Sequence, residues 1–118
     1  KVRPGYETNF VAVRMAEALL AEEASMWQSV ERLNEGRDWF LGEMSALGLR
    51  TAPSGGNFLL IHLGTPANTV TASLTEHGIL VRDLASYGFP EAIRLTLGTP
   101  DQNTRFLEQI HAILEDGQ

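Results

Sequence analysis

Arg94 is the residue whose surroundings in this sequence best suit ligand chemistry. It lies in the segment Ala92–Leu97, where the alternation of an extended strand would place Ile93 and Leu95 on one face and Arg94 on the other. A guanidinium group is a planar fork of N–H donors that matches a carboxylate, so Arg94 suits recognition of an amino acid's α-carboxylate. The alternative is an ordinary solvated strand arginine, and the pattern taken alone favours that alternative.

Two further polar side chains, Arg82 and Asn57, are candidates for the same site. Arg82 ends an apolar segment, and the following loop Leu84–Gly88 carries hydroxyl groups that could help to bind a phosphate or a carboxylate. The alternative is a local ion pair with Asp83, which the sequence alone favours. Asn57 follows two glycines, where its amide could donate to a ligand oxygen or could simply close the turn.

Other kinds of site find little support. The chain has no cysteine, which excludes disulfides, thiolate metal ligands and a thiol nucleophile. Its three histidines, His62, His77 and His111, do not have the spacing of metal ligands, so we expect no metal site. Ser54 precedes two glycines but lacks the flanking residues of a nucleophile elbow.

Composition describes a globular protein without polyanionic partners. The chain has 118 residues, 43% of them apolar, and a net charge of -6. That charge argues against binding to nucleic acid or to an anionic membrane, and no apolar run approaches the roughly 20 residues of a membrane span. We expect one domain over residues 1–118. The N-terminus has no signal-peptide core, so we expect an untargeted chain, and because the chain begins at Lys1 without a methionine we also expect a fragment of a longer protein.

The first half of the chain has helical periodicity. Thr8 or Asn9 can cap a helix that runs to about Ala21, and Ser25 can cap a second helix that ends at Gly48. Shorter elements follow. They are a strand over Leu49–Ala52, a strand over Asn57–Leu63, a helix from a Thr65 cap to Gly78, strands over Ile79–Arg82 and Ala92–Leu97, and a last helix behind a capping box at Thr99–Gln102.

This order of elements predicts a two-layer α/β (α+β) sandwich. Its sheet should be small, mixed or mainly antiparallel, with the helices gathered on one face. The segment Asn57–Leu63 is apolar on both faces, which indicates a central strand and a second sheet face that needs a cover. A missing partner surface would supply that cover.

Four segments in order resemble histidinol-phosphate aminotransferases, and together they extend from the first residue to the final helix. These segments are Lys1-Val2-Arg3-Pro4-Gly5-Tyr6 through Asn9, Pro53-Ser54-Gly55-Gly56-Asn57-Phe58, Gly78-Ile79-Leu80-Val81-Arg82-Asp83, and Ile93-Arg94-Leu95-Thr96-Leu97-Gly98-Thr99. The combination of the last two is more specific than either alone. The resemblance implies the C-terminal small domain of a fold-type-I aminotransferase, with residues 1–8 as the linker from a missing large domain.

The resemblance also implies roles for the three candidate residues. Arg94 would bind the substrate's α-carboxylate, Arg82 would help to hold its phosphate or other distal group, and Asn57 would line the site. The implied reaction is amino-group transfer between histidinol phosphate, or a related amino acid, and a 2-oxo acid such as 2-oxoglutarate. The implied cofactor is pyridoxal 5'-phosphate, and the implied setting is a cytoplasmic homodimer in histidine biosynthesis.

The catalytic lysine of that family is not matched in this chain. Its one lysine, Lys1, lies at the very end of the sequence, where a side chain cannot be held in a desolvated pocket with a lowered pKa. We therefore expect the chain alone to bind no cofactor, to contribute no catalytic residue and to be inactive.

Departures from the family pattern leave the identity of the substrate undecided. They lie at Gly5 and in the loop Tyr87–Pro90, so a threonine-phosphate decarboxylase or an aromatic aminotransferase of the same branch is an alternative. A different class of alternative is a stand-alone module that binds an amino acid or another small carboxylate through Arg94.

Overall fold

The computed structural model describes residues 9–116 of the 118-residue chain. It divides into two compact units, residues 1–34 and residues 35–118. The boundary falls inside the second helix, and the expectation of one domain over residues 1–118 stays a prediction. The expected linker, residues 1–8, lies outside the described residues. Among the residues that are described, no helix is both long and apolar enough to cross a membrane.

The first unit contains helix α1 (Phe10–Leu20) and the start of helix α2 (Glu23–Ala46). The Asn9 side chain accepts a hydrogen bond from the Val11 amide at 2.8 Å, which confirms one of the two predicted caps. The predicted cap at Ser25 is wrong. The Glu22 carbonyl accepts from the amides of Ser25 and Met26, so the helix has already begun before Ser25.

The second unit begins with the C-terminal part of α2, which is anchored in the core by Phe40 and Met44, both fully buried. Gly48 follows with a φ of +72°, a left-handed conformation that glycine adopts without steric cost. The predicted end of this helix is therefore confirmed.

Four short strands form one antiparallel sheet in the order β1-β2-β4-β3. Their bounds are Arg50–Thr51 for β1, Phe58–His62 for β2, Arg82–Asp83 for β3 and Ala92–Thr96 for β4. The central place of β2 agrees with its apolar pattern. The strand predicted over Ile79–Arg82 is shifted, because the Ile79 amide donates to Leu74 and closes the preceding helix instead of joining the sheet.

Helices α3 (Ala67–Glu76) and α4 (Pro100–Asp116) complete the unit, with a short 3-10 helix, η1 (Ala85–Tyr87), that the sequence did not predict. Helix α3 is capped at Pro66 and not at the predicted Thr65. The capping box of α4 is confirmed, because the Thr99 amide donates to Gln102 Oε1 at 2.9 Å and the Gln102 amide donates to Thr99 Oγ1 at 3.4 Å.

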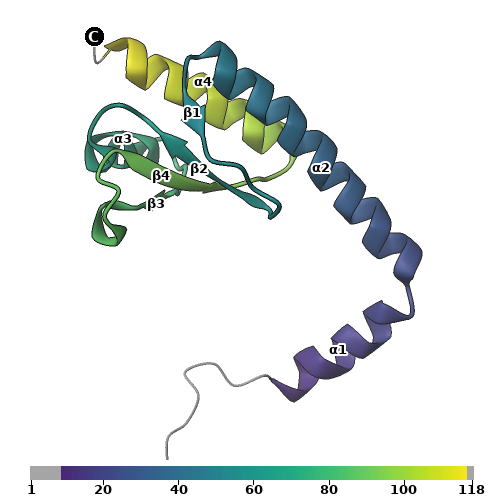
Figure 1. Ribbon diagram of the computed structural model, residues 1–118. Helices are drawn as coiled ribbons and strands as arrows, with labels where there is room; N and C mark the ends of the chain where they lie inside the picture. The colour runs from purple at the N-terminus through teal and green to yellow at the C-terminus, as the bar shows by residue number, and fades with distance from the viewer. Residues whose placement is uncertain (1–8, 117–118) are drawn as a thin grey trace, which may run out of the picture. The chain divides into compact units, whose positions relative to one another are not determined.

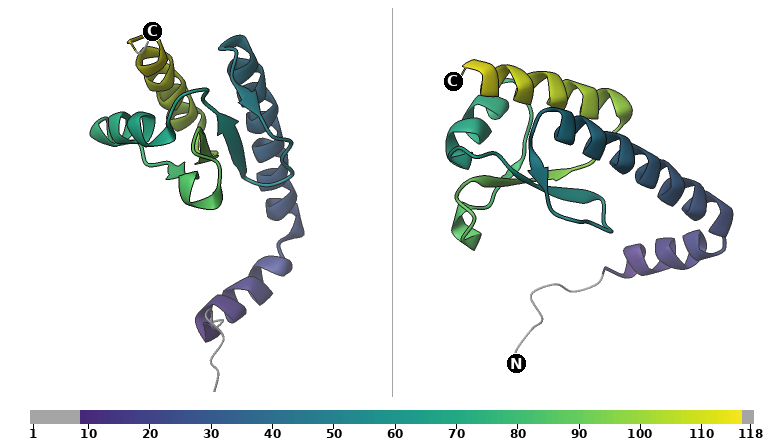
Figure 2. Two further views of the ribbon diagram at one scale, coloured as in Figure 1. Left: turned by 60° about the vertical axis from the view of Figure 1, so that its left-hand side comes forward. Right: turned by 45° about the horizontal axis from the view of Figure 1, so that its top comes forward.

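The sheet has one buried face and one open face. The buried inner face consists of Leu59, Ile61, Ile93 and Leu95, and its helical cover includes Phe40 and Phe106, whose ring centroids are 5.8 Å apart. Residues 35–46 of α2 and helix α4 lie on one side of the strands (Figure 1; Figure 2, right). The opposite, outer face includes Phe58, Leu60, Arg82, Arg94 and Thr96, all exposed or half-buried, and at one end the half-buried His62 and the buried Ala92. The structure is the predicted two-layer α/β sandwich with an open sheet face.

Candidate anion-binding site

Two arginines face each other on the outer face of the sheet. Arg82 of β3 and Arg94 of β4 are direct cross-strand partners, so their side chains leave the sheet on the same side. Like charges in this position destabilise a sheet. The ion pairs found within residues 9–116 are Arg14 with Glu17 and His111 with Glu115. Neither pair neutralises Arg82 or Arg94, and the two guanidinium groups therefore form a site of unbalanced positive charge.

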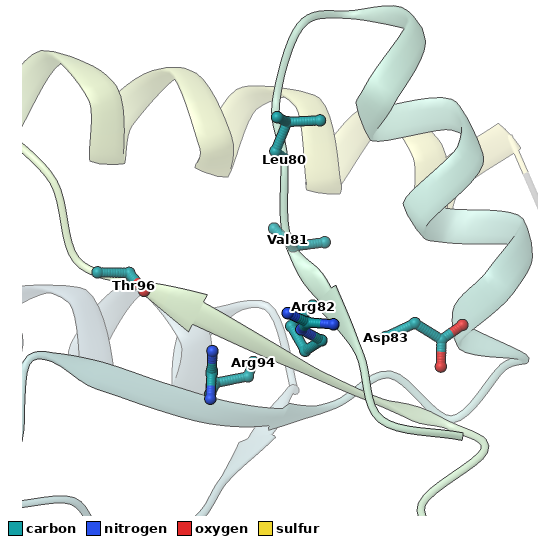
Figure 3. Close-up of a pocket in the computed structure, with 6 residues that line it drawn as sticks. All are labelled: Leu80, Val81, Arg82, Asp83, Arg94 and Thr96. Carbon is teal, nitrogen blue, oxygen red and sulfur yellow. The ribbon is translucent and has the colours of Figure 1, made fainter. Parts of the chain in front are cut away.

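The two arginines line an open pocket of about 390 Å³. Its other lining residues are Leu80, Val81, Asp83 and Thr96. Figure 3 shows both guanidinium groups on the pocket side of β3 and β4, with Thr96 beyond Arg94 along its strand. A carboxylate or a phosphate group is the kind of ligand that such paired guanidinium groups bind.

Asp83 does not neutralise Arg82. Its Oδ1 accepts a hydrogen bond from the Ala85 amide at 2.6 Å, in the turn that leads into η1. The carboxylate points away from both arginines in Figure 3. The local ion pair that the sequence favoured for Arg82 is therefore not formed, because adjacent strand residues project to opposite sides and the turn takes the carboxylate.

Arg94 has an aromatic neighbour. Its guanidinium carbon lies 5.5 Å from the centroid of the Phe58 ring, which belongs to the outer face of β2. Arg94 is exposed and does not enter the helical layer. It thus has the orientation that the strand alternation predicted.

Asn57 stands apart from the two arginines. It is exposed, lies just before β2, and its backbone carbonyl accepts from the Leu97 amide at 2.8 Å. It is not among the residues that line the pocket. The hydroxyl groups of the loop Leu84–Gly88 do not line it either, although the sequence suggested that they would.

Leu80 and Val81 are lining residues that the sequence analysis did not identify as such. The sequence predicted that both residues belong to a strand, yet they lie in the connection before β3. The only signal for them was their place next to Arg82. No group of three or more metal-ligating side chains lies close together within the part of the chain that is described.

Comparisons with known proteins show the family to which the chain belongs. The family model for aminotransferase class I and II matches residues 2–110. The chain is 35% identical over 114 residues to histidinol-phosphate aminotransferase 2 of Carboxydothermus hydrogenoformans, and 38% identical over 115 residues to the protein of that name from Pseudomonas fluorescens Pf-5. Each alignment covers 97% of this chain, but only 32% and 31% of the two relatives.

A solved structure shares the fold. L-threonine-O-3-phosphate decarboxylase from Porphyromonas gingivalis superposes with a TM-score of 0.76 at 25% identity, over 92% of this chain and 35% of its own. The chain thus spans about a third of the length of the proteins that it matches.

Proposed function

Because this chain belongs to the class I and II aminotransferases, we propose that it is the substrate-binding small domain of a pyridoxal-phosphate-dependent enzyme that transfers an amino group between histidinol phosphate and 2-oxoglutarate. The observation that carries the proposal is the cross-strand pair Arg82 and Arg94 at one open pocket. Similarity to relatives named histidinol-phosphate aminotransferase supports the choice of substrate.

Each arginine has a separate part in the proposal. Arg94 binds the α-carboxylate of the amino acid or oxo acid, because its planar fork makes two parallel hydrogen bonds with such a group. Arg82 binds the phosphate or other distal group. An anion between them removes the repulsion of two like charges held directly opposite each other. Asn57 remains a proposed substrate contact, although it is not among the residues that line the pocket.

The described residues, 9–116, include no lysine to which the cofactor could be attached. The pocket offers guanidinium groups but no amine that could bind the cofactor covalently. When bound, pyridoxal phosphate supplies the electron sink for the reaction at the α-carbon. The part of this chain is to bind and orient the substrate, while a large domain of the same enzyme holds the cofactor.

The remaining parts of the proposal follow from the family. We place the enzyme in the cytoplasm as a homodimer that serves histidine biosynthesis. The half-exposed Phe58 and Leu60 of the outer face support a further partner surface, because apolar groups on a sheet are more stable when covered.

The test is an assay of the protein that the complete reading frame encodes. We expect it to bind pyridoxal phosphate, seen as visible absorbance, and to convert 2-oxoglutarate to glutamate with histidinol phosphate as donor. Arg94→Lys should raise the KM for 2-oxoglutarate at least tenfold, because an ammonium group cannot reproduce the two-point contact. A protein without such absorbance would contradict the proposal.

One structural neighbour favours a second reaction on the same site. The match to L-threonine-O-3-phosphate decarboxylase fits a pocket that receives a phosphorylated amino acid. Release of carbon dioxide from phosphothreonine, without consumption of an oxo acid, would identify that activity. Transamination of phenylalanine or tyrosine would identify an aromatic aminotransferase.

A stand-alone binding module is the alternative from another class. It is favoured by the fact that both arginines belong to this chain. Calorimetric titration of the 118-residue chain with glutamate and with phosphoserine distinguishes it. Micromolar binding that is lost in Arg94→Ala would support the module, and absence of heat would disfavour it.

A further inference from the structure

The guanidinium group of Arg94 lies over the Phe58 ring. In the register of β2 and β4, Phe58 pairs with Thr96 and Leu60 pairs with Arg94, so Phe58 is the diagonal neighbour of Arg94. Aromatic and long side chains reach each other across this diagonal. The distance of 5.5 Å from guanidinium carbon to ring centroid is that of a cation–π contact.

The Phe58 ring is itself supported by the turn before β2. Ser54 Oγ donates to the Phe58 carbonyl at 2.6 Å and accepts from the Gly56 amide at 3.2 Å. A Cβ atom on Gly56 would lie 3.4 Å from ring atom Cε1, so the Gly56 backbone lies against the ring. Arg37 of α2 donates to the Gly56 carbonyl at 3.4 Å. A series of contacts thus leads from α2 through the turn and the ring to Arg94.

A cation–π contact does not use the hydrogen-bonding capacity of Arg94. The cation lies over the face of the aromatic ring, and the guanidinium group keeps its N–H donors for a carboxylate. Arg82, directly across the strand, repels Arg94 in the absence of an anion. This repulsion would push the Arg94 side chain away from Arg82, and the contact with the Phe58 ring opposes that movement. A side chain that is already oriented loses less conformational freedom when it binds a ligand.

We propose that Phe58 is a positioning residue that holds the Arg94 guanidinium in its carboxylate-binding orientation before the substrate arrives. The proposal rests on the proposed function only in giving Arg94 a carboxylate to bind. The orientation itself is a property of the free chain and can be measured without a ligand.

The direct test is NMR of the Arg94 side-chain Nε–Hε group in the 118-residue chain. In the wild type, we expect the ring current of Phe58 to shift this proton signal upfield. Phe58→Leu should abolish the upfield shift and increase side-chain motion, and Phe58→Tyr should retain both properties. The control is Phe10→Leu, which removes an exposed ring of α1 that is 76% exposed and should change nothing at Arg94. An Arg94 signal that is the same in wild type and Phe58→Leu would overturn the proposal.

Gly56→Ala provides a second variant in case Phe58→Leu does not fold. The added methyl group would lie 3.4 Å from the ring, in van der Waals contact with it, and should restrict the motion of the ring. The Arg94 Hε shift should then change while the circular dichroism spectrum stays native. An unchanged Hε shift with a displaced Phe58 ring signal would count against the proposal.

Kinetics of the enzyme from the complete reading frame separate this proposal from the proposed function. Phe58→Leu should raise the KM for glutamate about two- to fivefold, the value of a partly exposed cation–π contact, with a smaller change in kcat and recovery in Phe58→Tyr. An inactive wild-type enzyme would refute the proposed function and leave the NMR result intact. An active enzyme that depends on Arg94 but has the same KM in Phe58→Leu would refute the positioning role alone.

Discussion

At the scale of single residues, the site depends on an arrangement that costs the free protein stability. Arg82 and Arg94 are direct cross-strand partners without a carboxylate partner among residues 9–116. A sheet gains from opposite charges in such a pair and loses from like charges. A residue pair that weakens the fold, and that lines a pocket, is better explained by a bound anion than by packing.

This arrangement predicts opposite effects of one substitution on stability and on binding. Arg82→Gln should raise the free energy of unfolding by roughly 0.2–1 kcal/mol, because the repulsion with Arg94 is removed. The same variant should lose most of the stabilisation that inorganic phosphate gives the wild type. Thermal unfolding of both proteins at increasing phosphate concentration measures the two effects.

Arg50→Gln is the matched control for that experiment. Arg50 lies on β1, at the other edge of the sheet, and is likewise exposed. Its removal should leave the phosphate effect unchanged. Equal phosphate stabilisation of the wild type and Arg82→Gln would show that Arg82 takes no part in the site.

The sequence predicted Arg94 better than the residues around it. Alternation over five residues was sufficient to place Arg94 opposite the buried Ile93 and Leu95, and β4 has that alternation. The state of Arg82 was not predictable in this way. Asp83 could either pair with Arg82 or accept a hydrogen bond from the turn before η1. The sequence did not predict η1, so it could not decide between the two.

At the scale of elements, several local capping signals were predictive, although those at Ser25 and Thr65 were not, and strand bounds that depend on tertiary pairing were not predictable. Asn9, Gly48 and the Thr99 capping box act through neighbours in the sequence, and the structure has all three. The bounds of β3 depend on pairing with β4, a long-range property. The pattern Ile79–Arg82 therefore suggested a strand that begins too early.

The connection between β4 and α4 holds the end of the strand that carries Arg94. Asn103 is the one buried polar residue among those described. Its Oδ1 accepts from the Gly98 amide at 2.8 Å, and its Nδ2 donates to the Gly98 carbonyl at 3.3 Å. These two bonds fix the end of the strand that carries Arg94 to the first turns of α4.

Asn103→Ala should lower the free energy of unfolding by about 1–3 kcal/mol, because it leaves a part-buried amide and carbonyl without their partner. Urea denaturation followed by circular dichroism measures the loss. Thr104→Ala, an exposed change one residue further along α4, should cost less than about 0.5 kcal/mol. An equal loss of unfolding free energy in the two variants would mean that the two hydrogen bonds between Asn103 and Gly98 add nothing to stability beyond helix propensity.

At the scale of the whole molecule, the proposed function divides binding and chemistry between two parts of one enzyme. The pocket and both arginines lie within residues 35–118, whereas the only lysine of the sequence is Lys1. A Schiff-base lysine needs a desolvated site that lowers its pKa. Under the proposed function, this chain therefore contributes recognition, and the reactive lysine belongs to a part of the enzyme that aligns with the other two thirds of its relatives.

The separation predicts that the 118-residue chain alone, mixed with pyridoxal phosphate, histidinol phosphate and 2-oxoglutarate, forms no glutamate. It should also acquire no visible absorbance that survives gel filtration, because no buried amine is available to hold the cofactor. The protein from the complete reading frame should show both properties under the same conditions. Retention of the cofactor by the short chain, and its loss in Lys1→Ala, would show that the side-chain amine of Lys1 binds the cofactor. The proposed division between recognition and chemistry would then be wrong.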